Sequence, residues 1–180
     1  MHRLIVFCIG FSITGCGNYL KNSFSSGDCI GGNIEFAPAE LPETENYRLL
    51  VYKNSSLFLF QNGEDLTLQI DSGNKFVFEY QYSKPVNPMM VDAGYTETIL
   101  FEIDPGLDRF LLSGALLQGA KAVYGNLCFC ADAGYHPVSD GCIAGRKTGK
   151  NEWQVKMNIK AYGQNREFSK MLSETFKMAK

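Results

Sequence analysis

The chain has 180 residues, of which 45% are hydrophobic and 20% are charged, and its formal net charge is −2. This composition is typical of a folded domain and argues against intrinsic disorder. The near balance of charges gives no electrostatic reason to bind nucleic acid, so we expect no nucleic-acid partner.

The first residues combine a short basic start, Met1 to Arg3, with an apolar run over residues 4–14. A membrane-spanning helix needs roughly 20 apolar residues, so this run is too short to cross a bilayer stably. It fits the hydrophobic centre of a secretory signal peptide, and we expect residues 1–15 to be removed from the mature protein. A buried N-terminal strand or helix is the alternative.

The residues after this run carry a second signal. Ile13-Thr14-Gly15-Cys16 places a branched apolar residue and two small residues directly before a cysteine. This tetrapeptide resembles the lipobox of bacterial lipoproteins, in which the cysteine is lipidated and the chain is cleaved just before it. The resemblance covers residues 1–16 and implies that Cys16 carries a diacylglycerol and an acyl chain such as palmitate. Two or more such chains hold a protein stably to a lipid bilayer.

The residue that follows Cys16 bears on which bacterial membrane would hold the lipid anchor. By the rule known for enteric bacteria, Asp there retains a lipoprotein at the inner membrane, so Gly17 favours the outer membrane. We therefore expect a lipid-anchored protein of the bacterial cell envelope. Residues 16–28 are rich in Ser, Asn and Gly and predict a flexible tether, and residues 29–180 predict a single disulfide-stabilised β domain.

The mature chain is dominated by short runs of Val, Ile, Phe, Tyr and Thr separated by turn residues. Asn62-Gly63 predicts a two-residue hairpin turn of type I′, which needs positive φ at both central residues. Residues 75–82 alternate as expected of a half-buried antiparallel strand. The strands predicted for the first half of the chain are residues 30–36, 47–52, 57–61, 66–70, 75–82 and 96–103.

The second half predicts further strands and one or two helices. Leu116, Leu117 and Ala120 have helical spacing and predict one short helix over residues 113–120. Residues 168–179 favour a helix, because a strand would place Lys170 and Glu174 among the inward-facing residues. The remaining predicted strands are residues 109–112, 123–131, 143–147 and 153–161.

The fold class follows from this succession. About nine short strands predict a mainly β protein, either a single antiparallel β-sandwich or a small β-barrel. One short helix and a possible C-terminal helix complete it. Predicted strands do not alternate with predicted helices, so the sequence argues against a doubly wound α/β fold.

Besides Cys16, the mature chain contains Cys29, Cys128, Cys130 and Cys142. Four cysteines in an exported protein predict two disulfides. A Cys128–Cys130 bond would close a very small ring between two side chains on one face of a strand, so we discount it. The favoured pairing is Cys29–Cys128 with Cys130–Cys142, and the crossed pairing, Cys29–Cys130 with Cys128–Cys142, remains open.

Cys128, Cys130 and Cys142 with His136 form an alternative metal site. Three thiolates and an imidazole would suit zinc or cuprous copper. The Cys-x-Cys spacing differs from that of the usual zinc pair, however, and an exported compartment oxidises thiols. We therefore expect no metal and no other cofactor.

Candidate catalytic residues are few. His136 is the only histidine after removal of the signal peptide, and Ser139 and Asp140 lie close to it in sequence. Proximity in sequence does not make a catalytic triad, whose geometry is spatial, and no Gly-x-Ser-x-Gly motif is present. We expect a loop histidine and no enzyme.

The candidate binding residues are in the long loop over residues 83–95. It carries Met89, Met90 and Tyr95 with few charges. Long loops in compact domains are often functional, and methionine adapts to binding surfaces. The alternative is that these residues fold back as a lid over one end of the domain.

The sequence thus predicts a non-catalytic envelope lipoprotein that binds an unidentified protein or small ligand. A barrel-type carrier is one version of this hypothesis, in which Phe76, Phe78, Tyr80 and Tyr82 line a cavity instead of packing as ordinary core. The metal-binding lipoprotein is the other alternative.

Overall fold

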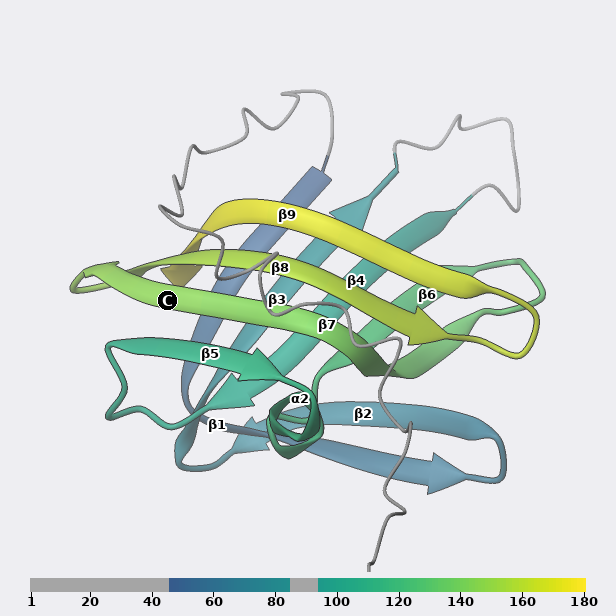
Figure 1. Cartoon of the computed structure of the whole chain (residues 1–180), viewed down its shortest axis with the longest axis horizontal. Coiled ribbons are helices and arrows are strands. Elements are labelled where there is room, and N and C mark those ends of the chain that lie inside the picture. The colour runs from purple at the N-terminus through teal and green to yellow at the C-terminus, as the bar shows by residue number, and fades with distance from the viewer. Residues whose placement is uncertain (1–45, 85–93) are drawn as a thin grey trace, which may run out of the picture.

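The computed structural model describes residues 46–84 and 94–180. It is mainly β, with nine strands in one sheet and one short helix (Figure 1), which confirms the predicted fold class. Within these residues, no helix is long and apolar enough to cross a membrane. The elements are β1 (Asn46–Asn62), β2 (Asp65–Ser72), β3 (Lys75–Ser83), β4 (Tyr95–Ile103), β5 (Arg109–Ser113), α2 (Ala115–Gly119), β6 (Val123–Cys128), β7 (Gly134–Gly149), β8 (Glu152–Tyr162) and β9 (Glu167–Met178).

The sheet closes into a ring. The strand order is β2-β1-β3-β4-β6-β7-β8-β9, β5 pairs with β7, and β1 also pairs with β9. All pairs are antiparallel except β1 and β9, which run parallel and pair only through Leu50 with Lys177 and Val51 with Met178. In Figure 1 the layer of β7, β8 and β9 crosses the layer of β1, β3 and β4. The fold therefore combines features of the predicted sandwich and barrel.

Strand β1 belongs to two parts of the molecule. Residues 47–52 and 57–61 were expected as two strands, but they form one strand that is irregular around Asn54, where φ is 51°. Its first half pairs with β3 and its second half with β2. The β1–β2 hairpin covers the outside of the ring, where Leu57 packs with Val77, Leu100 and Val123.

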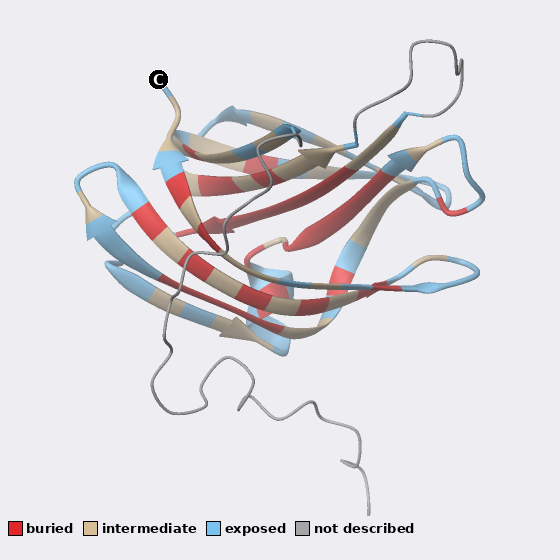
Figure 2. Cartoon of the chain, turned by 90° about the horizontal axis from the view of Figure 1, so that it is seen from above, coloured by how far each residue is buried: buried red, intermediate tan, exposed pale blue. Residues whose placement is uncertain are grey.

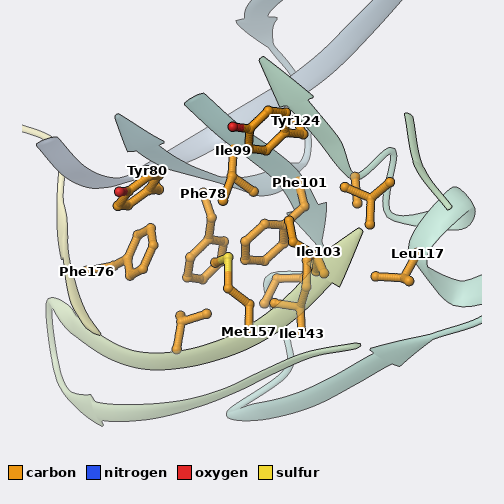
Figure 3. Packing of buried hydrophobic residues seen from close by; sticks show 14 of the residues in the cluster. Phe78, Tyr80, Ile99, Phe101, Ile103, Leu117, Tyr124, Ile143, Met157 and Phe176 are labelled. Atoms are coloured by element: carbon orange, nitrogen blue, oxygen red, sulfur yellow. The ribbon is translucent and has the colours of Figure 1, made fainter. Parts of the chain in front are cut away.

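Aromatic rings fill the interior of the ring (Figure 3). The centroid of the Phe78 ring lies 4.8 Å from that of Phe101, 5.5 Å from Trp153 and 5.7 Å from Phe176. These four residues come from four strands, and all are fully buried. Along β8, buried residues alternate with partly exposed ones (Figure 2), as the predicted period of two requires. The aromatic face of β3 is packed core around Phe78, which gives no support to a cavity there.

Helix α2 fills the space beside the last residues of β4. Strand β6 pairs with β4 only as far as Leu100. Beyond that point, the Glu102 N–H donates to the Ala120 carbonyl at 2.8 Å, and Leu117 is fully buried. The predicted helix over residues 113–120 therefore exists but is shorter than expected, and Gly114 precedes its first residue.

The predicted C-terminal helix is wrong. Residues 167–178 form β9, which pairs along its whole length with β8. Lys170 and Glu174 face inward, as a strand requires, because Lys170 finds an acidic partner inside the ring: its Nζ lies 2.8 Å from Glu97 Oε2. The expected loop around His136 is also wrong, since β7 already begins at Gly134.

Candidate functional site

A cleft of about 690 Å³ lies between three turns. They are the β1–β2 hairpin turn, the β6–β7 turn and the β8–β9 turn. Its volume is within the range of small-molecule sites. Its lining contains acidic, amide and aromatic side chains and, in the part of the chain that the structure describes, no lysine or arginine; the lining residues are 61, 63–66, 131–137 and 162–164.

Asp132 holds two of these turns together. Its buried carboxylate accepts the backbone N–H of Asn165 at 3.0 Å. Its carbonyl oxygen accepts from Asn126 Nδ2 at 3.4 Å and from His136 Nε2 at 3.2 Å. A side chain at Gly163 would come within 2.9 Å of the same carboxylate, so glycine permits this close approach. These contacts join the β6–β7 turn to the β8–β9 turn beside the cleft.

The hairpin turn closes the cleft on another side. Gln164 Nε2 donates to Glu64 Oε2 at 2.6 Å and so joins the β8–β9 turn to the β1–β2 turn. The predicted hairpin is confirmed, but its central residues are Gly63 and Glu64, because Asn62 pairs with Asp65. Only Gly63 has positive φ, at 62°, so the expected type I′ turn is wrong.

Two tyrosines supply aromatic surface to the cleft. Tyr162 is 53% exposed, and its hydrogen bond with Glu167 raises the pKa of the phenol. A hydrogen bond from Lys160, with Nζ at 2.8 Å, in turn lowers the pKa of Glu167. Tyr135 lies across Gly125, where a side chain would collide with its ring, and burial raises its pKa. Both rings are thus held by specific neighbours.

An aromatic stack connects the cleft with the interior of the ring. His136 stacks on Phe168 with centroids 5.1 Å apart, and Phe168 stacks on Tyr124 at 5.0 Å. The Arg166 guanidinium lies 4.4 Å from the Phe168 centroid. Burial raises the pKa of Tyr124, and nearby Glu97 adds to this effect.

Behind this stack, charged residues gather inside the ring. Glu97 is 5% exposed, and it pairs with Lys170, whose Nζ also lies 5.0 Å from the centroid of Tyr80. Burial, with Glu97 and Glu174 nearby, raises the pKa of Tyr80. The carboxylate of Glu174 is buried without a hydrogen bond or ion pair to any side chain the structure describes, and burial raises its pKa.

Of the predicted binding residues, only Tyr95 is described. It begins β4, it is partly buried, and its ring lies 6.4 Å from that of Tyr82. Tyr95 therefore belongs to the tyrosines around Glu97, and it does not line the cleft. Met89, Met90, Cys16 and Cys29 lie outside the described residues.

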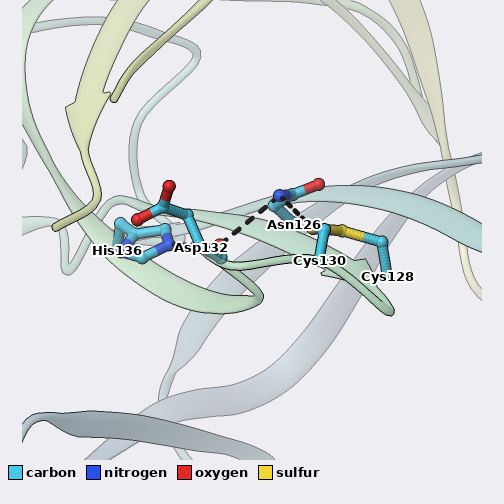
Figure 4. The surroundings of a disulfide bond; sticks show 5 residues. All are labelled: Asn126, Cys128, Cys130, Asp132 and His136. Atoms are coloured by element: carbon cyan, nitrogen blue, oxygen red, sulfur yellow. Dashed lines mark hydrogen bonds between the residues drawn. A yellow bond between two sulfur atoms is a disulfide. The ribbon is translucent and has the colours of Figure 1, made fainter. Parts of the chain in front are cut away.

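Cys128 and Cys130 are bonded to each other, with Cα atoms 5.3 Å apart (Figure 4). Both expected pairings are therefore wrong for these two residues. The reason is local: β6 ends at Cys128 and the chain bends at Phe129 and Cys130, so the two cysteines are not neighbours on one face of a strand. Cys142 is in a disulfide as well.

This bonding gives no support to the metal alternative. The sulfur atoms of Cys128 and Cys130 are not thiolates, and the described residues contain no group of three side chains that could hold a metal ion. Ser139 Oγ donates to the Lys160 carbonyl at 3.4 Å, and the Asp140 carboxylate accepts the Gly141 N–H. Neither residue is hydrogen-bonded to His136.

The cleft was not predicted from the sequence, although the turns that line it can be recognised there. Glycine and polar residues at 62–65, 132–134 and 163–165 indicate turns. The sequence does not show that these turns meet, because their contacts join residues as far apart as Glu64 and Gln164. Comparison of the chain with protein-family models, curated proteins and solved structures found no match.

Proposed function

We propose that the protein is a lipid-anchored component of the bacterial cell envelope, bound to the outer membrane through Cys16, whose β domain binds a small polar ligand. The anchor rests on the lipobox-like residues 13–16. The ligand site rests on one observation, the cleft of about 690 Å³ between the three turns. Binding without catalysis fits the hydrogen bonds that engage Ser139 and Asp140 elsewhere.

The chemistry of the lining favours a neutral or cationic ligand. Glu64, Asp65 and Asp132 contribute carboxylates to the lining, and no lysine or arginine from the described residues lines the cleft to balance them. Tyr135 and Tyr162 offer ring faces, which attract cations and pack on the apolar faces of sugars or amines. An anionic ligand would meet electrostatic repulsion here.

Ligand binding can be tested by NMR titration of the mature domain with three probes. Spermidine represents a cation, glucose a neutral polar molecule and citrate an anion. We expect saturable shifts of backbone resonances at residues 131–137 and 162–164 with spermidine or glucose, and none with citrate. Saturable citrate binding at these residues would contradict the charge argument, and no shift with any of the three probes would count against the cleft as a site.

Tyr162→Ala tests the role of the aromatic surface, and it has a matched control. Phe60 has the same exposed fraction as Tyr162, 53%, and lies on the hairpin but not in the cleft. We expect Tyr162→Ala to weaken binding of the best probe at least fivefold, since aromatic contacts of this kind contribute about 1–2 kcal/mol. Phe60→Ala should leave the affinity unchanged, and equal losses in both variants would contradict the assignment.

The anchor is tested separately with Cys16→Ser in cells. We expect the variant to remain unprocessed or to become soluble, because the lipid-bearing thiol is lost. Fractionation of membranes measures this outcome. A variant that still partitions fully with membranes would overturn the lipid-anchor proposal without affecting the ligand site.

A further inference from the structure

The Cys128–Cys130 disulfide lies at the surface, unlike the other cysteine that the structure describes. Cys130 is exposed and Cys128 is partly exposed, whereas Cys142 is 3% exposed. The residues beside the bond are apolar and also exposed: Leu127 to 39% and Phe129 to 88%. A reagent or a partner chain can therefore reach this bond directly, and apolar side chains flank the point of contact.

This bond contributes little to the stability of the fold. It closes a loop with a single residue between its ends, and the stabilisation from a disulfide grows with the length of the loop that it closes. Other contacts hold the turn: the Ala133 N–H donates to the Cys130 carbonyl at 3.2 Å, and Asp132 is tied to Asn165. Reduction of the bond should therefore leave the domain folded.

One buried side chain is arranged to stabilise a thiolate at Cys130. Asn126 is fully buried, and its Nδ2 donates to Cys130 Sγ at 3.4 Å (Figure 4). A hydrogen bond to the charged form of a group favours that form, so Cys130 is the sulfur better able to carry negative charge. Its exposure makes it also the sulfur more open to attack.

We propose that Cys128–Cys130 is a redox-active disulfide that oxidises a dithiol of a partner polypeptide. In the first step, a thiolate of the partner attacks Cys130 Sγ, the Cys128–Cys130 bond breaks, and Cys128 leaves as a thiolate. In the second step, the second thiolate of the partner attacks its own sulfur in the mixed disulfide. Cys130 then leaves as a thiolate that Asn126 Nδ2 stabilises.

The two steps balance. The partner loses two electrons and two protons and gains a disulfide, while Cys128 and Cys130 gain the two electrons and take up two protons from solvent. Each chain oxidises one dithiol, and no further oxidant is needed for this single turnover. Phe129 and Leu127 would contact apolar residues of the partner, so a polypeptide dithiol suits this surface better than a small polar thiol. This activity is independent of the ligand proposed for the cleft.

The first test uses the oxidised mature protein, with dithiothreitol as the probe and alkylation followed by mass spectrometry as the readout. Peptide mapping without reduction should find Cys128 linked to Cys130. At limiting dithiothreitol, this bond should be reduced at least tenfold faster than the disulfide of Cys142, with no fall in melting temperature. A different linkage, reduction of Cys142 first, or unfolding on reduction of Cys128–Cys130 would each overturn the proposal.

The second test separates the roles of the two sulfur atoms and of the apolar neighbours. Trapping uses a reduced peptide that contains one cysteine and flanking leucines, with a diamide pulse as the oxidant. Because this peptide has no second thiolate to release the intermediate, Cys128→Ser should trap at least tenfold more mixed disulfide than Cys130→Ser. With the two-cysteine form of this peptide and no diamide, Phe129→Ser in the otherwise unchanged chain should slow oxidation of the peptide at least threefold but leave reduction by dithiothreitol unchanged. Equal trapping by both variants, or no effect of Phe129→Ser on the peptide, would overturn the assignment.

Discussion

The two ends of the ring interior differ in chemistry, although the same strands build both. At one end the inward-facing side chains are aromatic and pack against each other, and at the other they are tyrosines and charged residues. Strands β3, β4 and β9 contribute Phe78, Phe101 and Phe176 to the apolar end and Tyr80, Glu97 and Lys170 to the polar end. Inward- and outward-facing side chains therefore alternate along the whole of each strand. The inward-facing side chains, however, change from apolar at one end of the strand to polar at the other.

The two ends of the ring therefore contribute differently to the stability of the fold and to the proposed ligand binding. Burying aromatic surface stabilises the fold directly, whereas a buried ion pair must first offset the cost of removing its charges from water. The cleft lies beside the polar end, to which His136 and Phe168 connect it. The apolar end thus contributes mainly to stability, and the polar end lies beside the surface that we assign to ligand binding.

The largest effect on stability is expected when a buried aromatic side chain at the apolar end is truncated. Phe78→Ala removes a fully buried ring that contacts Phe101, Trp153 and Phe176. We expect the free energy of unfolding to fall by about 3–5 kcal/mol, as is usual when a buried phenylalanine is truncated. Urea denaturation measures this loss, and a loss below about 1 kcal/mol would contradict the packed interior.

A smaller effect is expected at the polar end. Lys170→Met leaves the Glu97 carboxylate buried without its ion-pair partner. Since the Lys170 side chain is 25% exposed, solvent reduces the cost, and we expect a loss of about 2 kcal/mol. Adding Glu97→Gln to this variant should recover part of that loss, because no unpaired charge then remains.

The matched control for Lys170→Met is its neighbour on the opposite face of β9. Met171 is 70% exposed, so Met171→Ser should change the free energy of unfolding by less than about 0.5 kcal/mol. Equal losses for Lys170→Met and Met171→Ser would contradict the inward placement of Lys170.

The smallest effect, and one of opposite sign, is expected for Glu174→Gln. Burial raises the pKa of Glu174 in the folded state, so the carboxylate costs stability at pH values above that raised pKa. The variant should therefore be more stable than the natural chain at pH 7. Its advantage should shrink as the pH falls through the raised pKa toward the unfolded value near 4.3, because the folded state then binds the proton more tightly. Denaturation curves at pH 7 and pH 4 measure this difference, and an advantage that grows on acidification would contradict the burial of Glu174.

The alternation of apolar and polar residues predicted strands correctly where one face of the strand is apolar. The alternation in residues 75–82 and 153–161 predicted β3 and β8, because side chains of a strand point to opposite faces in turn. The same reasoning misjudged β9, since Lys170 looked incompatible with an inward position. Its partner Glu97 is 73 residues away, and no local pattern reveals such a pairing.

By itself the sequence determined the strand-rich character of the chain and its main turns, and the spacing of residues 13–16 is the basis of the proposed lipid anchor. These features depend on residues that are close together, through side-chain alternation, turn preference and the spacing of a short motif. Only the tertiary structure decided which cysteines pair, where Lys170 and Glu174 lie, and that three distant turns enclose a cleft. Each of these depends on contacts made when the strands close into a ring, and closure brings together residues whose separation along the chain carries no local signal.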